Sequence, residues 1–257
     1  MGASADKAGN RSSLAIGEIP VTGIGTWFVC LMGIMMVAAL LRCWQLPNES
    51  AWWDEVVTLR CLPEPTLGAF IRCERPDDPA MAPVYFALAH GWSRIFSPDE
   101  TVMRILSVLA GLGSIALLFA AGRRLFGAGA GLIAAAAMAV SLPQIYYAQE
   151  IRMYVFVMPF VLISTDALFA ALTSGRKTWW AVHMAANLLL VFTHLFSVFF
   201  LAAQGLYLAA YRTRRTWIPW GIAHGLILLG LAGWLFSADA EEIRGATSWL
   251  VRPGWRE

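Results

Sequence analysis

Long runs of apolar residues, separated by short polar segments, make up most of this chain. The first run extends from Gly23 to Trp44, and a helix needs roughly 20 apolar residues to cross the hydrocarbon core of a bilayer. Six further runs lie at residues 101–122, 128–148, 153–173, 178–193, 195–211 and 217–236. The pattern predicts an all-α polytopic membrane protein with about seven transmembrane helices. The runs at 178–193 and 195–211 are short for spans.

Residues 82–97 form an apolar stretch that could be a short span or a helix lying on the membrane surface. Its polar side chains recur at three- and four-residue spacing: His90, Ser93, Arg94 and Ser97. One polar stripe on an apolar helix is typical of an interfacial helix. We therefore expect this segment to stay on the surface, within a large loop that contains interfacial helices.

Clusters of basic residues support this interpretation, because Lys and Arg near span ends favour the cytoplasmic side. Three clusters stand out: Arg123-Arg124, Arg176-Lys177, and Arg212 with Arg214-Arg215. If 82–97 does not cross, all three face the cytoplasm together with the N-terminus. The expected organisation is a cytoplasmic tail (1–22), a transmembrane domain (23–236) with an outer loop (45–100), and an outer C-terminal segment (237–257).

Composition agrees with a membrane protein. The chain has 257 residues, of which 58% are hydrophobic and 14% charged, whereas a soluble domain has about 25% charged residues. Its net charge of +2 gives no signal for nucleic-acid binding. Cys61 and Cys73 both fall in the outer loop, where a disulfide can form if that side is oxidising.

Charged residues close to the predicted spans are the candidates for chemistry. Asp54 and Glu55 follow the first span directly, and Glu150 and Arg152 lie in a short turn between two spans. Rigid supports of this kind suit preorganised sites. An acid and an arginine at the bilayer surface suit a hydroxyl that loses its proton and a lipid-linked phosphate. Taken singly, each could equally be a solvated acid or a local ion pair.

Polar residues within the predicted spans have a structural interpretation. We expect them to make contacts between helices, since unpaired polar groups are costly in lipid. They are Asp166, His183, Asn187, Gln204 and His224. The sequence shows no His/Cys spacing typical of zinc sites and no glycine-rich phosphate loop.

Several stretches resemble, in order, motifs of the GT-C membrane glycosyltransferases. They are WWDEVVTL (52–59), VMRILSVLAG and its continuation to YYAQEIRMY (102–154), and FTHLFSVFFLAAQGLYL (192–208). The resemblance is strongest to the bacterial enzymes grouped with protein O-mannosyltransferases, the lipid A aminoarabinose transferase and the rhizobial galacturonosyltransferases. Where that family usually has His-Pro-Pro-Leu-Tyr, this chain has MAPVY (81–85). SWLVRPG (248–254) looks like the family's outer loop cut short, so the chain resembles the N-terminal part of such an enzyme.

The resemblance implies an inverting transferase that moves a sugar from a polyprenyl-phosphate donor to a hydroxyl of a lipid, glycan or protein. It would act on the periplasmic side of a bacterial plasma membrane. Asp54 would be the general base and Glu55 would orient the loop. Glu150 would orient Arg152 or, with Asp54, bind a divalent metal such as Mg or Mn.

The remaining expected site residues fall into two groups. Those expected to hold the donor phosphate are Arg152, Arg104 and Arg94, and those expected to support the site are Tyr85, Tyr154 and His194. Two other functions stay open from the sequence: a carrier or flippase for a lipid-linked sugar, and a non-catalytic remnant.

Overall fold

The computed structural model describes residues 23–48, 50–78, 82–212 and 214–237. The expected cytoplasmic tail (1–22) and all but one residue of the expected C-terminal segment (237–257) lie outside these ranges. Eight helices form the main body: α1 (Gly23–Cys43), α5 (Glu100–Phe126), α6 (Ala128–Ala139), α7 (Leu142–Ala148), α8 (Tyr154–Ser174), α9 (Lys177–Val191), α10 (Ser197–Tyr211) and α11 (Arg214–Leu235). Three shorter helices lie between α1 and α5: α2 (Trp53–Cys61), α3 (Leu67–Glu74) and α4 (Pro83–Ile95).

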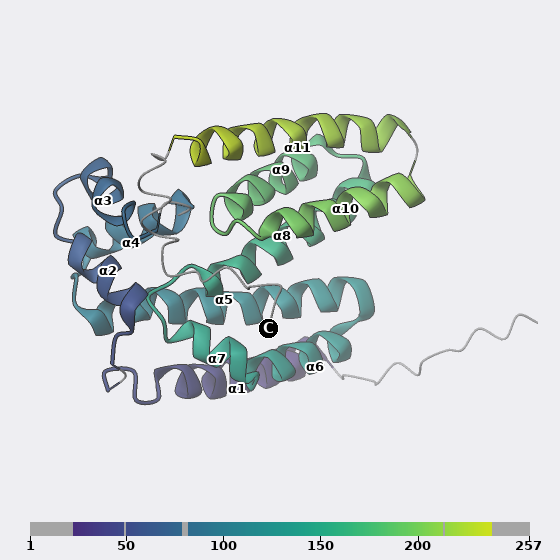
Figure 1. The fold of residues 1–257 in the computed structure, drawn as a ribbon. Helices are drawn as coiled ribbons and strands as arrows, with labels where there is room; N and C mark the ends of the chain where they lie inside the picture. Colours follow the sequence, from purple (N-terminus) through teal and green to yellow (C-terminus); the bar gives the residue numbers. More distant parts are fainter. Residues whose placement is uncertain (1–22, 49, 79–81, 213, 238–257) are drawn as a thin grey trace, which may run out of the picture.

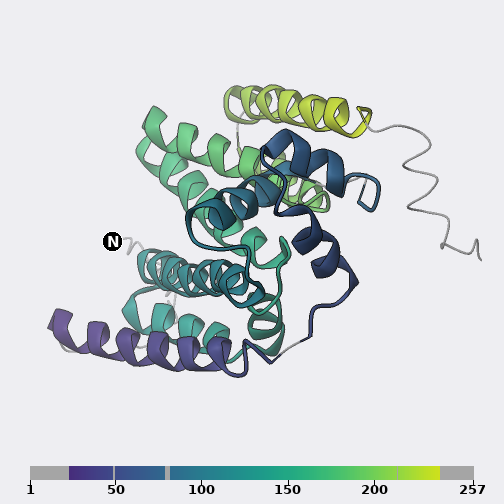
Figure 2. The same ribbon diagram turned by 90° about the vertical axis from the view of Figure 1, so that its left-hand side faces the viewer.

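The main helices form two layers that meet along α5 and α8. One layer holds α1, α5, α6 and α7, and the other holds α8 to α11 (Figures 1 and 2). The three short helices gather at one end of these layers. Within the described residues the regular secondary structure is entirely helical, which confirms the all-α fold.

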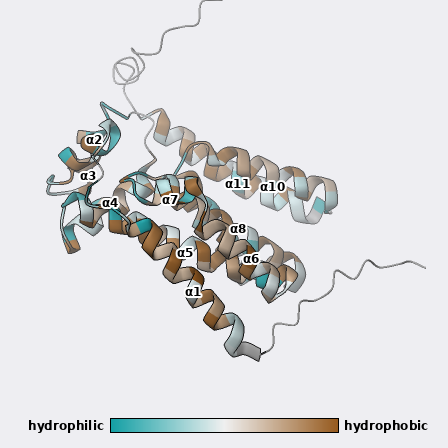
Figure 3. Ribbon diagram, turned by 90° about the horizontal axis from the view of Figure 1, so that it is seen from below, coloured by the Kyte–Doolittle hydropathy of each residue, from teal (hydrophilic) through white to brown (hydrophobic). Residues whose placement is uncertain are grey.

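Four helices are long and apolar enough to cross a membrane: α1, α5, α8 and α11. Figure 3 shows hydrophobic residues along these long helices. The chain is therefore a multi-pass membrane protein. Helices α9 and α10 have 15 residues each, which is about 22 Å of helix against a core of about 30 Å. The expected total of seven spans stays a prediction.

The expected span 128–148 is not one continuous helix. It divides into α6 and α7, which are bent by 62°. Pro143 explains the break, because proline has no N–H to donate to the carbonyl four residues earlier. That carbonyl belongs to Ala139, and it accepts a hydrogen bond from Nη1 of Arg42 at 2.9 Å. Nη2 of Arg42 donates to the Met138 carbonyl at 3.2 Å, so the buried guanidinium caps the end of α6.

Helix α4 confirms a helix at 82–97, and the residues of its polar stripe divide between protein and solvent. His90 and Ser93 are buried, and His90 Nε2 lies 3.0 Å from the Glu64 carbonyl oxygen. Ile95 and Phe96 instead are 75% and 60% exposed. At a membrane, apolar side chains meet lipid at low cost, whereas buried polar groups need partners. His90 and Ser93 therefore face protein, while Arg94 is exposed.

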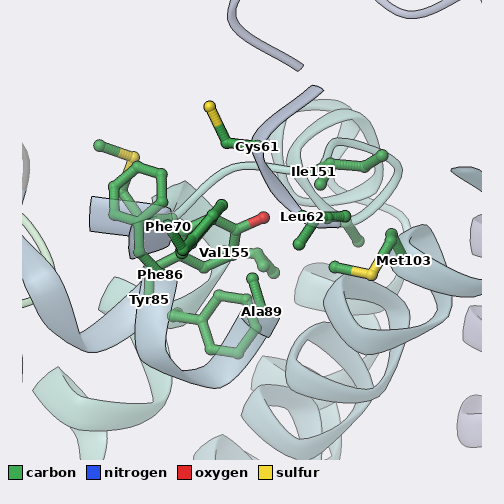
Figure 4. Packing of buried hydrophobic residues seen from close by; sticks show 12 residues of the cluster. Cys61, Leu62, Phe70, Tyr85, Phe86, Ala89, Met103, Ile151 and Val155 are labelled. Atoms are coloured by element: carbon green, nitrogen blue, oxygen red, sulfur yellow. The ribbon is translucent and has the colours of Figure 1, made fainter. Parts of the chain in front are cut away.

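An apolar cluster holds the short helices onto the main body. It joins α2, α3 and α4 to α5 and α8 through Phe70, Tyr85, Phe86, Met103 and Val155 (Figure 4). A disulfide between Cys61 and Cys73 links α2 to α3 beside this cluster. The pairing that the sequence allowed is therefore present, and α2 and α3 are fixed to each other covalently.

Buried polar side chains link α8, α9, α10 and α11, as expected from the sequence. Ser164 Oγ donates to Asn187 Oδ1 at 2.6 Å and accepts from Gln204 Nε2 at 2.9 Å. Asn187 Nδ2 in turn lies 2.7 Å from His224 Nε2. Two residues after Ser164 on α8, Asp166 forms an ion pair with Arg124 at 3.0 Å. These contacts confirm that the polar residues connect helices.

Replacing Ser164 with Ala should lower the free energy of unfolding in detergent by about 1–2 kcal/mol, because two interhelical hydrogen bonds are lost. Thr165→Ala is the matched control, since the Thr165 hydroxyl donates to the Val161 carbonyl within its own helix. Denaturant titration of both variants measures the difference. Equal losses for the two would contradict an interhelical role for Ser164.

Candidate functional site

A cleft of about 640 Å³ opens at the end of the bundle that carries α2, α3 and α4. Three surface loops meet there: the segment after α3, the turn between α7 and α8, and the turn between α9 and α10. The lining residues are Trp53, Asp54, Val57, Glu74, Asp77, Asp78, Arg152, Met153, Tyr154 and His194. The chain brings them together from positions up to 141 residues apart, between 53 and 194.

The guanidinium of Arg152 is the centre of this cleft. Its Nη2 lies 3.2 Å from Asp78 Oδ2 and 3.6 Å from Asp54 Oδ2. Its Nη1 donates to the Thr58 hydroxyl at 3.5 Å. The buried Nε has no hydrogen-bond partner among the described residues. The sequence-based expectation that Asp54 and Arg152 meet on one rim is therefore met.

Glu55 points away from the cleft and into the protein. Its Oε1 accepts the Ile151 backbone N–H at 2.7 Å, and its Oε2 pairs with Arg104 at 3.3 Å. Arg104 also pairs with Glu100 at 2.7 Å and donates to the Leu46 carbonyl at 3.0 Å. Glu55 thereby fixes the residue before Arg152 to the helix that carries Asp54, a position that suits orientation of the loop.

Burial is the main cause of the shifted pKa values of three groups that line the cleft: Glu74, Asp78 and His194. Burial raises the pKa of the Glu74 carboxyl from 4.5 to about 7, against the lowering effects of Thr58 and Arg152. Burial also raises the pKa of Asp78, in spite of its ion pair with Arg152. It lowers the pKa of His194, which the Arg152 charge lowers further. Burial disfavours the charged form of each group, so Glu74 is close to half protonated at neutral pH.

The other expected site residues lie in different places. Arg94 is exposed and donates to the carbonyls of Pro63 and Glu64. Arg104 is buried in the ion pairs that hold Glu55 and Glu100. Tyr85 is buried in the apolar cluster, whereas Tyr154 and His194 line the cleft. The structure thus brings Tyr154 and His194 to Arg152 and leaves the guanidinium groups of Arg94 and Arg104 in contact with protein carbonyls or carboxylates.

Glu150 is buried beside the cleft and is not among its lining residues. Burial raises the pKa of its carboxyl, and a hydrogen bond with the Tyr146 hydroxyl opposes that rise. In the part of the chain that the structure describes, no three His, Cys, Asp or Glu side chains are arranged to hold a metal ion. A Mg or Mn ion held by Asp54 and Glu150 stays a prediction.

The sequence did not single out Glu74, Asp77 or Asp78 from the other acids of the outer loop. Asp78 reaches Arg152 across 74 residues, and no local spacing reports such a contact. The Cys61–Cys73 pair was the available signal, because a disulfide between these cysteines must bring Glu74 to the helix that carries Asp54.

One comparison with known proteins gives a match. Residues 77–237 match the family model described as dolichyl-phosphate-mannose-protein mannosyltransferase. This range includes Arg152 and His194, and it begins after Asp54. No curated protein and no solved structure matches the chain.

Glu55→Ala should destabilise the protein by about 3 kcal/mol, because it leaves the buried Ile151 N–H unpaired and removes one partner of the buried Arg104. Asp54→Asn, one residue away, should change stability by less than about 1 kcal/mol, since the Asp54 side chain is partly exposed and Arg152 keeps Asp78. Thermal unfolding in detergent measures both. A Glu55→Ala variant as stable as Asp54→Asn would show that Glu55 does not anchor the loop.

Proposed function

Because this chain belongs to the dolichyl-phosphate-mannose-protein mannosyltransferase family of GT-C membrane glycosyltransferases, we propose that it moves a sugar from a polyprenyl-phosphate donor to an acceptor hydroxyl. The acceptor is a lipid, a glycan or a protein. The observation that carries the proposal is the meeting of Asp54 and Arg152 in one cleft, with 3.6 Å between Asp54 Oδ2 and Arg152 Nη2.

Asp54 is the general base in this proposal. Its carboxylate takes the proton of the acceptor hydroxyl while that oxygen attacks the anomeric carbon of the donor sugar. The bond between the anomeric carbon and the phosphate oxygen breaks, and polyprenyl phosphate leaves with the bonding electrons. Attack from the face opposite the leaving group inverts the anomeric centre without a covalent intermediate. The acceptor gains the sugar and Asp54 holds the proton.

Arg152 is the group that binds the leaving phosphate. Charge develops on the phosphate as the bond breaks, and fixed positive donors stabilise that charge. The Nε of Arg152 has no hydrogen-bond partner among the described residues, so this N–H can be donated to a phosphate oxygen. His194 and Tyr154 line the same cleft and serve as neutral neighbours of the donor.

The proposed location is the outer face of a bacterial plasma membrane. Exposed basic residues gather at the end of the bundle opposite the cleft: Arg123 and Arg124 end α5, and Arg176 follows α8. At the cleft end, Arg42 and Arg104 are buried. Basic residues favour the cytoplasmic side, which leaves the cleft outside. The Cys61–Cys73 disulfide at the cleft end suits an oxidising compartment.

The alternative of a carrier receives less support. A carrier needs polar groups along a path through the membrane, and the candidates for the start of such a path are Asp166, His183 and Asn187. Asp166 pairs with Arg124 at 3.0 Å. Instead, His183 Nε2 accepts from the Trp220 indole at 2.9 Å, and Asn187 Nδ2 donates to Gln204 Oε1 at 3.0 Å. These side chains satisfy one another, so they favour a structural role over substrate contact.

Asp54→Asn should reduce sugar transfer by about 10²–10⁴-fold, the usual contribution of a positioned base. The measurement uses membranes that contain the protein and polyprenyl phosphates carrying labelled mannose, galacturonic acid or aminoarabinose. Label transferred to membrane lipid, glycan or protein is counted.

Glu64→Gln is the control for this experiment, since the Glu64 side chain does not line the cleft. It should transfer sugar at the wild-type rate. Transfer by Asp54→Asn at that same rate would remove Asp54 from the mechanism. Absence of transfer by the wild-type protein from all three donors would contradict the proposed function.

Cysteine labelling should place the two ends of the bundle on opposite sides of the membrane. Pro98→Cys and Arg176→Cys are introduced separately in a protein whose Cys30 and Cys43 are replaced by Ala. A membrane-impermeant maleimide should label Pro98→Cys in intact bacterial spheroplasts and Arg176→Cys only after lysis. The reverse order of labelling would place the cleft in the cytoplasm.

A further inference from the structure

Two carboxylates already compensate the positive charge of Arg152, which weakens its attraction for an anionic ligand. Two carboxylates, Asp54 and Asp78, already share its Nη2. If both are ionised, the group of three carries a net negative charge before any phosphate arrives. A phosphate that binds here must compete with these carboxylates, and any further anion beside Arg152 would weaken its binding.

Glu74 is such a further acid. It lines the cleft, it is 0% exposed, and neither carboxyl oxygen has a hydrogen-bond partner among the described residues. The neighbouring Cys73 is tied to α2 through Cys61, so Glu74 has little freedom to move toward water. Unpaired carboxylates at such a depth are costly.

Thr58 is near enough to Glu74 to act on its titration, but it cannot satisfy an ionised carboxylate. A threonine hydroxyl has one proton to donate. Thr58 Oγ1 donates that proton to the Asp54 carbonyl oxygen at 3.2 Å, and it accepts from Arg152 Nη1 at 3.5 Å. A protonated Glu74 can donate to the Thr58 oxygen, whereas an ionised Glu74 keeps two oxygens without a hydrogen-bond partner among the described residues and interacts with the charge of Arg152.

We propose that Glu74 is a positioning residue that controls phosphate binding through Arg152. In its neutral form, Glu74 leaves the Nε of Arg152 free for the donor phosphate. In its ionised form, it is a third carboxylate on the same guanidinium, and it excludes the phosphate. This inference rests on the proposed function, because it takes a polyprenyl-phosphate sugar as the ligand.

The raised pKa of Glu74, about 7 and caused first by burial, puts this change within the neutral range. The charged and titratable groups around Glu74 are Asp54 on α2, Asp77 and Asp78 after α3, Tyr85 on α4, Arg152 after α7, and His194 after α9. Below about pH 7 the neutral form prevails and binding is strong. Above it, each pH unit should weaken binding by up to about tenfold.

The experiment measures binding of polyprenyl-phosphate mannose to the purified protein in detergent at about pH 6 and about pH 8.5. This diester keeps one negative charge throughout, so the ligand itself does not titrate. Wild-type protein should bind at least about tenfold more weakly at the higher pH. Glu74→Gln and Glu74→Met are neutral at both pH values and should bind equally well at both. Glu64→Gln is the matched control and should follow the wild type.

Each outcome has a distinct meaning. Equal binding by the wild type at both pH values would overturn the role of Glu74 without any variant. So would a loss of binding at high pH that persists in Glu74→Gln or Glu74→Met, because another group would then be titrating. Absence of binding by the wild type at both pH values would instead contradict the proposed donor. Thermal unfolding of each variant separates a folding defect from a change in binding.

Discussion

The carboxylate of Glu55 joins parts of the chain that lie almost a hundred residues apart. It accepts the Ile151 N–H at 2.7 Å and pairs with Arg104 at 3.3 Å. Asp54 is the residue before Glu55, and Arg152 is the residue after Ile151. One buried contact therefore sets the distance between the proposed base and the proposed phosphate-binding group. A buried ion pair is costly to form and more costly to break, which makes this register of α2 against the α7–α8 turn rigid.

Three buried arginines lie at the cleft end of the bundle, and they differ in the groups that they contact. Arg42 donates to carbonyls at the end of α6, and Arg104 pairs with Glu55 and Glu100. Both use their Nη groups to hold the fold, and neither lines the cleft. Arg152 pairs with Asp54 and Asp78 inside an open cleft and keeps one buried N–H without a partner among the described residues. It is the arginine of these three that is placed to receive a ligand.

Much of the fold could be predicted from hydrophobic runs, because lipid demands long apolar helices. The break at Pro143 was also visible in the sequence, but its bend depends on Arg42, which supplies the hydrogen bonds that the proline removes. The polar stripe on α4 is only partly buried: His90 and Ser93 face protein, whereas Arg94 is exposed. The three- and four-residue spacing of its polar residues predicted the helix. Which of these residues are buried depends on whether lipid or protein lies on each side.

The candidate site was predictable where the chain is constrained locally. Asp54 follows a span directly and Arg152 sits in a short turn, so both had to lie at one membrane surface. Asp78 pairs with the same guanidinium from the segment after α3, and Glu74 lines the same cleft from the end of α3. Both positions follow from tertiary packing of α3. Arg94 and Arg104 have the charge for a phosphate, but nearby carbonyls and carboxylates already occupy their donors.

The bond between Cys61 and Cys73 has a practical consequence for handling the protein. Cys30 and Cys43 are free and exposed in the structure, which invites the use of thiol reductants during purification. The same reagents would reduce the disulfide between α2 and α3. Glu74, which lines the cleft beside Cys73, would then lose that covalent constraint. A preparation kept in reductant can therefore be monodisperse, well inserted in detergent and still lack an ordered cleft, so inactivity measured in those buffers does not represent the protein with its disulfide intact.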